Sequence, residues 1–313
     1  MESISAVICA YTMDRWDELA AAVDALKSQA KEGDQIIVVS DHNDELLARA
    51  ETEFTGVDVM PNKHTKGLSG ARNTGIAAAT GDLVLFLDDD ALPMPGWLDG
   101  YRARFEEDPN IAAVGGAVRP NWDGGKAPSW FPVEFGWVVG CDYRGLPGSG
   151  ADIRNPIGAS MGLRRHALDD IEWFSEGMGR VGALPVGCEE TELCIRLRQH
   201  EPSARIVRDT VPVVRHRVPL NRQTTKYFLS RCYHEGRSKA ALSSLVGSED
   251  GLSAERSYAS KILVSGAGNY ARQAIGGDIK AVGRLALLVA GFASTGAGFA
   301  LKSLSSKNKG ATT

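Results

Sequence analysis

Short apolar segments alternate with helical patterns over the first hundred residues, and this alternation constrains the fold more than any other feature of the sequence. The segments Ile4–Ala10, Gln35–Ser40 and Leu83–Leu87 are rich in Val, Ile and Leu, as buried strands are. Between the first two segments, Leu19 and Leu26 recur at the spacing of one helix face. Apolar strands that alternate with helices predict an α/β fold, with a mostly parallel central sheet flanked by helices.

Polar residues follow three of these expected strands, at the points where the strands end. The tripeptide Ala10-Tyr11-Thr12 follows the first strand, Asp41 follows the second, and the triplet Asp88–Asp90 follows Leu83–Leu87. Ligands of parallel sheets bind beyond the carboxyl ends of the strands. We therefore expect these three polar groups to lie at one edge of the sheet, although they are far apart in the sequence.

The triplet Asp88-Asp89-Asp90 places three like charges in a row. Alternate residues of an extended chain point to opposite sides, so Asp88 and Asp90 share one side and Asp89 points away. Carboxylate oxygens at a ligand edge suit a hard divalent cation such as Mg²⁺ or Mn²⁺. An isolated triplet of this kind is more often a solvated turn or a helix N-cap, so the assignment depends on the residues around it.

The net charge of −4 conceals a strong asymmetry along the chain. From Ser203 onward there are 17 Lys and Arg against 6 Asp and Glu, a balance of +11, which leaves −15 for residues 1–202. A basic C-terminal third favours an anionic ligand or membrane surface, although scattered solvated charges give the same count. We expect no nucleic-acid partner.

The cysteines and the N-terminus indicate a cytoplasmic protein. The five cysteines are odd in number, widely spaced and without a CxxC pair, a pattern that favours reduced thiols over a zinc ribbon or a disulfide scaffold. The first residues, MESISAVICAYT, lack the basic start and the long apolar core of a secretory signal.

The C-terminal region combines basic and apolar segments. Leu285–Leu301 contains no charged residue and is flanked by Arg284 and Lys302, but its 17 residues are at the lower limit of the ~17–25 that span a bilayer. Its many small residues favour a helix that lies at a membrane interface, or packs on a second subunit in a homo-oligomer, over a full span. In Arg231–Leu242, basic side chains are placed to meet a diphosphate or anionic lipid, or to form a solvated helix face.

The segment Gly67–Leu98, which reads GLSGARNTGIAAATGDLVLFLDDDALPMPGWL, resembles the nucleotide-sugar core of the family 2 inverting glycosyltransferases of bacterial type. Further segments match the same family in order and spacing: VICAYT, IIVVSD, NPIGASMGLRR, GCEETELCIRL and VVRH. The resemblance covers residues 4–217 and includes the Asp-x-Asp metal motif. It implies the GT-A fold and a hexosyltransferase that moves a sugar from a UDP-sugar to a carbohydrate or lipid-linked acceptor.

The resemblance also assigns roles to individual residues. Asp41 would contact uracil, and Arg72 would lie near the diphosphate. Asp90 and His216 would hold the cation, Mn²⁺ or Mg²⁺, and Asp88 would contact either the ribose or the metal. The donor-binding set as a whole comprises Ala10, Tyr11, Thr12, Asp41, Gly67, Arg72, Asn73, Asp88 and Asp89.

An inverting transfer requires a general base that takes the proton of the attacking hydroxyl. Members of the family commonly carry Glu-Asp, then any residue, then Asp or Glu and Leu at this point. Here the sequence is Glu189-Glu190-Thr191-Glu192-Leu193, so Glu190 replaces the usual aspartate. Glu190 is therefore the predicted base and Glu189 the alternative, whereas Glu192 suits the negative charge preferred at a helix N-terminus.

The resemblance predicts a GT-A domain over residues 1–217, with a nucleotide-binding half over 1–118 and an acceptor half over 119–217. A basic and apolar helical region over 218–313 would follow it, and its composition suits either association with the inner face of the cell membrane or oligomerisation. Between Trp122 and Tyr143, aromatic side chains would either stack on an acceptor or pack on one another.

Two other functions fit parts of the pattern. A nucleotidyltransferase has a similar sheet, but it usually shows a glycine-rich loop with a basic residue after the first strand, which ICAYTMDRWDE lacks. A catalytically degenerate membrane scaffold predicts a broken metal motif or base, and both are intact here apart from the aspartate-to-glutamate change.

Overall fold

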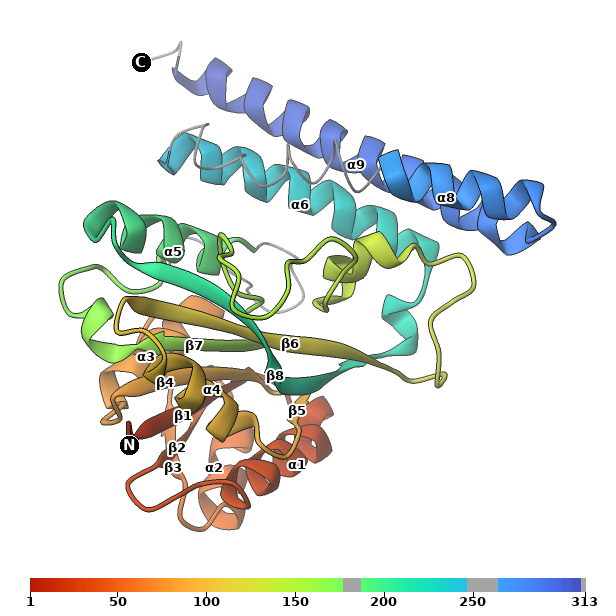
Figure 1. Ribbon diagram of the computed structural model, residues 1–313. Helices are drawn as coiled ribbons and strands as arrows, with labels where there is room; N and C mark the ends of the chain where they lie inside the picture. The colour runs from red at the N-terminus through yellow and green to blue at the C-terminus, as the bar shows by residue number, and fades with distance from the viewer. Residues whose placement is uncertain (177–186, 247–263, 311–313) are drawn as a thin grey trace. The chain divides into compact units, whose positions relative to one another are not determined.

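The computed structural model of the protein describes residues 1–176, 187–246 and 264–310. The described chain forms two compact units. The first holds residues 1–119, 147–176 and 189–216, and the second holds residues 120–146, 187–188 and 217–310 without the gap at 247–263. Figure 1 labels the helices and strands of both units.

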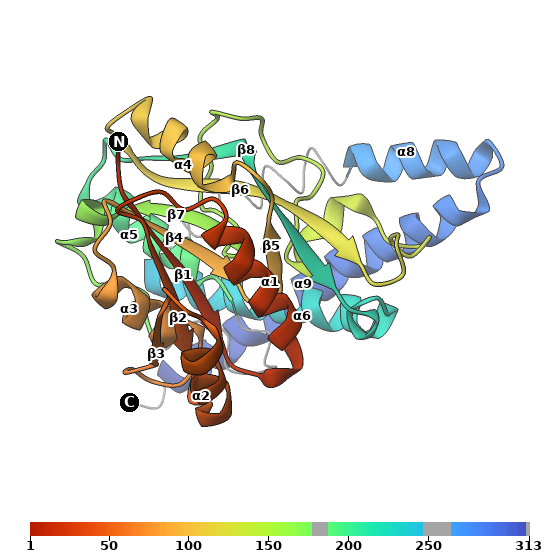
Figure 2. The ribbon, with the colours of Figure 1, turned by 90° about the horizontal axis from the view of Figure 1, so that it is seen from below.

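The first unit contains the start of the sheet as a parallel array, in agreement with the alternating pattern. Its four strands are β1 (Ile4–Ala10), β2 (Gln35–Ser40), β3 (Asp58–Pro61) and β4 (Leu83–Asp88). Strand β1 is parallel to β2 on one side and to β4 on the other, and β2 is parallel to β3 (Figure 2). This register sets Ala10 beside Ser40 and Cys9 beside Asp88, so the strand ends meet at one edge.

The remaining strands make the sheet mixed, in the order β3-β2-β1-β4-β7-β6-β8-β5. They are β5 (Ala91–Pro93), β6 (Ile111–Trp122), β7 (Ser160–Arg164) and β8 (Arg205–Val218). Strand β7 is antiparallel to both β4 and β6, and β5 is antiparallel to β8. The central sheet flanked by helices has the predicted GT-A architecture, and antiparallel strands complete its second half.

Helices cover both faces of this sheet. They are α1 (Trp16–Lys27), α2 (Asp44–Glu53), α3 (Leu68–Ala78), α4 (Trp97–Glu106) and α5 (Glu189–His200), with short 3₁₀ turns η1 (Met13–Arg15) and η3 (Arg165–Leu168). Val84 belongs to the core cluster that α3 and α5 share with the sheet. On the other face, the space beside Gly162 is filled by Leu85 and by Tyr101 of α4. Since Val84 and Leu85 are adjacent, they point to opposite faces, as strand geometry requires.

In the part of residues 225–310 that the structure describes, the second unit is formed by helices. It contains α6 (Thr225–Val246), α8 (Val264–Ile275) and α9 (Ile279–Gly310), together with the 3₁₀ segments η2 (Val133–Val139) and η4 (Leu220–Arg222). Helix α6 runs alongside α9 (Figure 1). A Cβ atom at Gly236 would lie 1.9 Å from the carbonyl oxygen of Thr295, and one at Gly298 would lie 2.0 Å from that of Tyr233. Glycines therefore let the two helices approach closely.

The apolar segment Leu285–Leu301 lies within α9. Residues 279–304 form a helix that is long and apolar enough to cross a membrane by length and composition, and most of its residues are not buried. Its exposed large apolar residues are Ile279, Val282, Val289, Phe292, Leu301 and Leu304, each more than half exposed.

Aromatic side chains of residues 122–137 pack on one another and on α6. The ring of the fully buried Phe228 lies within 6 Å of three others. The cluster comprises Trp122, Trp130, Phe131, Phe135, Trp137 and Phe228. Of the two interpretations of this aromatic segment, packing is the one for which the structure gives contacts.

Candidate active site

The pairing of β5 with β8 brings His216 to the aspartate triplet. Ala91 is the register partner of His216, so the residue before Ala91 also lies beside the imidazole. The His216 Nε2 atom is 3.1 Å from the Asp90 Oδ1 atom, and both side chains are buried. Asp88 completes the group, since one ligand atom from each of Asp88, Asp90 and His216 lies within 4.8 Å of the others.

This group has the chemistry of a divalent-cation site. Two carboxylate oxygens and one imidazole nitrogen converge, and such ligands suit Mn²⁺ and, through the oxygens, Mg²⁺. The Asp88 side chain is 30% exposed, whereas those of Asp90 and His216 are about 5% exposed. A cation held there would therefore have buried protein ligands on one side and remain accessible on the side of Asp88.

Arg15 neutralises the other side of the triplet. Its Nη1 atom lies 2.5 Å from Asp89 Oδ1 and 3.2 Å from Asp90 Oδ2. Burial raises the pKa of Asp89 to about 7, and Arg15 opposes that rise. Thr12 helps to fix the η1 turn that carries Arg15, because its hydroxyl accepts a hydrogen bond from the Asp14 amide. Sequence patterns did not point to Arg15, although it is a cation in the turn that follows the first strand of the ligand edge.

Arg72, on the first turns of α3, lies near three carboxylates from two other segments of the sequence. Its Nη1 atom lies 3.2 Å from Glu190 Oε1 and 3.4 Å from Glu189 Oε1, and its Nη2 atom lies 3.8 Å from Asp88 Oδ1. Burial alone would lower the pKa of the guanidinium, but Glu190 and Glu189 raise it above its ordinary value. The predicted diphosphate contact thus lies among the predicted base, its alternative and a predicted metal ligand.

Glu189 and Glu190 open α5, where the helix dipole favours negative charge. They differ in access to solvent, since the side chain of Glu190 is 16% exposed and that of Glu189 is 4% exposed. Glu192 also lies in the first turn and pairs with Arg196 of the same helix. The segment predicted to supply the base therefore contributes two carboxylates to the Arg72 group.

Asp41 is buried where β2 ends, and its carboxylate accepts several hydrogen bonds. The Gly67 amide donates to both of its oxygens at 3.0–3.1 Å, and the Asn62 side chain donates to Oδ1 at 2.7 Å. Gly67 has a φ of 133°, which a residue with a side chain rarely adopts. The predicted uracil contact and the first residue of the glycine segment are therefore joined directly.

Three further residues expected to bind the donor, Ala10, Tyr11 and Asn73, differ from one another in burial and in hydrogen bonding. Ala10 is buried, and its carbonyl accepts a hydrogen bond from the Asp41 amide. Tyr11 is partly exposed, with the Arg15 guanidinium over its ring. The Asn73 side chain donates to the carbonyl and accepts from the amide of Phe174, so it anchors the segment around that residue.

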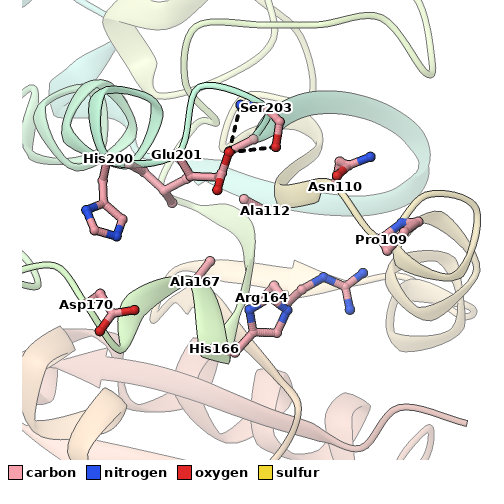
Figure 3. Close-up of a pocket in the computed structure, with 12 residues that line it drawn as sticks. Pro109, Asn110, Ala112, Arg164, His166, Ala167, Asp170, His200, Glu201 and Ser203 are labelled. Atoms are coloured by element: carbon pink, nitrogen blue, oxygen red, sulfur yellow. Dashed lines mark hydrogen bonds between the residues drawn. The ribbon is translucent and has the colours of Figure 1, made fainter.

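A separate cavity of about 270 Å³ lies elsewhere in the first unit (Figure 3). Figure 3 shows His166 and His200 on opposite sides of it. Its lining comprises Pro109, Asn110, Ala112, Arg164, His166, Ala167, Asp170, Leu197, His200, Glu201, Ser203 and Ala204. None of the residues expected at the donor or metal site is among them.

Comparison with known proteins identifies the family to which the chain belongs. The family model of glycosyl transferase family 2 matches residues 5–172. Glucosyl-dolichyl phosphate glucuronosyltransferase of Haloferax volcanii is 30% identical over 242 residues, which cover 76% of this chain and 77% of that protein.

Solved structures share the fold. A mannosyltransferase of Pyrobaculum calidifontis, in complex with GDP-Man and Mn²⁺, aligns over 97% of this chain and 87% of its own, with a TM-score of 0.61 and 16% identity. GalNAc-T7 with UDP, GalNAc and Mn²⁺ aligns over 83% of this chain and 54% of its own, with a TM-score of 0.53 and 14% identity. The chain has the GT-A fold and belongs to glycosyl transferase family 2.

Proposed function

We propose that the protein is a divalent-cation-dependent, inverting glycosyltransferase that moves a sugar from a UDP-sugar to a hydroxyl of a lipid-linked acceptor. The observation that carries the proposal is the convergence of Asp88, Asp90 and His216 at the strand edge that also receives Asp41 and Arg72. Family membership favours transfer of a sugar over the transfer of a nucleotidyl group.

Each residue of the site has its own role in a single displacement at the anomeric carbon of the donor sugar. Asp90, His216 and Asp88 would hold Mn²⁺ or Mg²⁺, which when bound neutralises charge on the departing diphosphate. Glu190 takes the proton of the acceptor hydroxyl while its oxygen forms a bond to the anomeric carbon. The bond from that carbon to the diphosphate oxygen breaks, its electron pair leaves with UDP, and the configuration inverts.

The uridine part of the proposal depends on Asp41. Its buried carboxylate is a hydrogen-bond acceptor, and the ring N–H of uracil is a donor of matching kind. Guanine also carries N–H donors, and solved structures of this fold contain either GDP-Man or UDP. The fold alone therefore does not distinguish uracil from guanine as the nucleobase of the donor, and a binding experiment is needed to do so.

Thermal unfolding with UDP or GDP, each with and without Mn²⁺, shows which of the two nucleotides the protein binds. Because a ligand that binds only the folded state raises the melting temperature, the proposal predicts stabilisation by UDP with Mn²⁺ that exceeds the effect of either component alone. A larger shift with GDP and Mn²⁺ would mean that the protein recognises guanine rather than uracil. The absence of a shift with every nucleotide and cation would overturn the proposal.

Two observations support a lipid-linked acceptor at the inner face of the membrane. The relative from Haloferax volcanii, which this chain matches over most of its length, is named for transfer to glucosyl-dolichyl phosphate. In addition, α9 exposes large apolar side chains, and residues 217–313 carry 14 Lys and Arg against 5 Asp and Glu. Apolar and basic groups together suit an anionic lipid surface.

A further inference from the structure

Arg72 is a buried cation whose orientation the surrounding residues fix. Its side chain is 2% exposed, and its guanidinium lies 5.2 Å from the Phe174 ring centroid and 5.7 Å from that of Phe86. The Phe174 backbone is itself held by two hydrogen bonds to Asn73, the residue after Arg72. Because aromatic rings and carboxylates surround it, the guanidinium is held toward the two glutamates of α5.

Gly158 borders the same space from the loop before β7. Its carbonyl accepts a hydrogen bond from Arg72 Nη2 at 3.3 Å. A Cβ atom at Gly158 would lie 1.9 Å from Glu190 Oε1 and 2.5 Å from Arg72 Nη2. The Glu190 carboxylate therefore lies between a guanidinium and a backbone segment that has no room for a side chain.

The two glutamates suit different tasks. Glu190 is the more exposed of the pair, so its carboxylate is the one that an entering hydroxyl can reach. Glu189 is almost fully buried at 3.4 Å from the same Arg72 nitrogen. When Glu190 accepts a proton and becomes neutral, Glu189 still balances the buried guanidinium, so no uncompensated charge is left behind.

We propose that Arg72 is a positioning residue that, together with Gly158, aims Glu190 at the acceptor hydroxyl, and that Glu189 is its permanent counter-ion rather than the base. This assignment depends on the proposed function for the role of Glu190. It differs from a role for Arg72 as a diphosphate ligand, because a positioning residue acts through Glu190 and a phosphate ligand acts through the donor.

A double-mutant cycle separates the two roles. The variants are Arg72→Lys, Glu190→Gln and their combination, assayed with whichever nucleotide-sugar the parent protein turns over fastest, so that an error in the uridine assignment leaves this test intact. We expect Arg72→Lys to lower kcat by about 30- to 100-fold with donor KM within about threefold, because the misplaced base is used only in the transition state. In the Glu190→Gln background, the same change should cost less than about threefold.

Two further variants and a control complete the design. Glu189→Gln should retain at least about tenfold more kcat than Glu190→Gln, since only the base moves a proton. Gly158→Ala should reproduce the kcat loss of Arg72→Lys with donor KM nearly unchanged. The control is Arg102→Lys, which changes an arginine of similar burial on α4, away from the site. Arg102 pairs with Asp34, which precedes β2, and with Asp99 of α4, and kcat should stay within about twofold.

Three outcomes would overturn the assignment. A rise in donor KM, or weaker binding of UDP with Mn²⁺ to Arg72→Lys, would make Arg72 a donor ligand. Additive losses in the double variant would mean that Arg72 does not act through Glu190. A larger kcat loss in Glu189→Gln than in Glu190→Gln would make Glu189 the base, a comparison that stands even where Arg72→Lys fails to fold.

Discussion

The His216 imidazole lies 3.1 Å from the Asp90 carboxylate, although the two residues belong to distant parts of the sequence. The register of β5 against β8 produces this contact, because it pairs His216 with Ala91. The backbone pairing thus places two buried ligand atoms beside the more exposed carboxylate of Asp88.

Replacing either buried member of this group should weaken cation binding. We expect His216→Ala and Asp90→Asn each to lower the affinity for Mn²⁺ by at least about tenfold, since each removes one ligand. Titration calorimetry of the protein with Mn²⁺ alone measures this without a substrate. His166→Ala is the matched control, because His166 lines the separate cavity. Equal losses in the control and in His216→Ala would contradict the site.

Arg15 should stabilise the protein when no cation is bound. Arg15→Met leaves Asp89 and Asp90 without their guanidinium, which we expect to lower the free energy of unfolding by about 1–2 kcal/mol. This is less than for a fully buried pair, because Arg15 is 19% exposed.

The same variant should respond more strongly to Mn²⁺, because the cation then supplies the charge that Arg15 no longer provides. Thermal unfolding with and without Mn²⁺ measures both effects. The control is Arg49→Met, which removes a half-exposed cation of α2 paired with Glu53. A smaller Mn²⁺-induced shift in Arg15→Met than in the parent would show that Arg15 supports cation binding instead.

The packing of α3 against β1 should be intolerant of a single methyl group. A Cβ atom at Gly75 would lie 2.4 Å from Val7 Cγ1, so we expect Gly75→Ala to destabilise the fold by about 1–3 kcal/mol. Urea unfolding measures the change. Gly148→Ala serves as the control, because no atom lies within 4 Å of its added Cβ, and an equal loss there would contradict the packing.

The Asp209 carboxylate should make part of the stability pH-dependent. Burial would raise its pKa, but hydrogen bonds from Arg104, Ser149 and the Val211 amide lower the pKa below its ordinary value. A carboxylate with a lowered folded-state pKa contributes stability above its unfolded pKa of about 3.9 and loses it as the pH falls further.

The stability gap between the parent and Asp209→Asn should therefore be constant from about pH 7 to 5 and shrink below about pH 4. Urea unfolding across this range tests the prediction. Asp152→Asn is the control, since Asp152 is more than half exposed in its pair with Arg205 and should show a small gap throughout. A stability gap for Asp209→Asn that grows on acidification would contradict a lowered pKa of Asp209 in the folded state.

The exposed apolar side of α9 should bind lipid. We expect the parent to sediment with vesicles of phosphatidylcholine and phosphatidylglycerol, and Val289→Glu to reduce the bound fraction several-fold, because a charge is costly in the apolar boundary. Val211→Glu alters a valine on β8 that is also more than half exposed, and it should have no such effect. Unchanged sedimentation of Val289→Glu, with a change of oligomeric state, would assign this side to a second copy of the chain.

Local sequence patterns were enough to predict the parallel half of the sheet and a divalent-cation site at its edge. The apolar runs of β1, β2 and β4 are visible without the structure because burial on both faces excludes polar residues. The antiparallel placement of β7 between β4 and β6 depends on long-range pairing, which a five-residue segment such as Ser160–Arg164 does not reveal.

The side-chain partners within the site are the part that sequence patterns did not predict. Arg15 and Arg72 are separated from their carboxylate partners by many residues, and their pairing depends on where η1, α3 and α5 meet the strand ends. Motif spacing could therefore assign Asp90 and Glu190 a chemical class, but only the packed structure shows which cation faces each of them.

The most direct test of the central claim is the release of UDP from a panel of UDP-sugars, measured with Mn²⁺ and again after the cation is removed with EDTA. The account predicts release from at least one donor with Mn²⁺, its loss with EDTA, its recovery on adding Mn²⁺ back, and at most about 1% of the parent rate in Asp90→Asn. Release that continues at the parent rate in EDTA, or in Asp90→Asn, would contradict it.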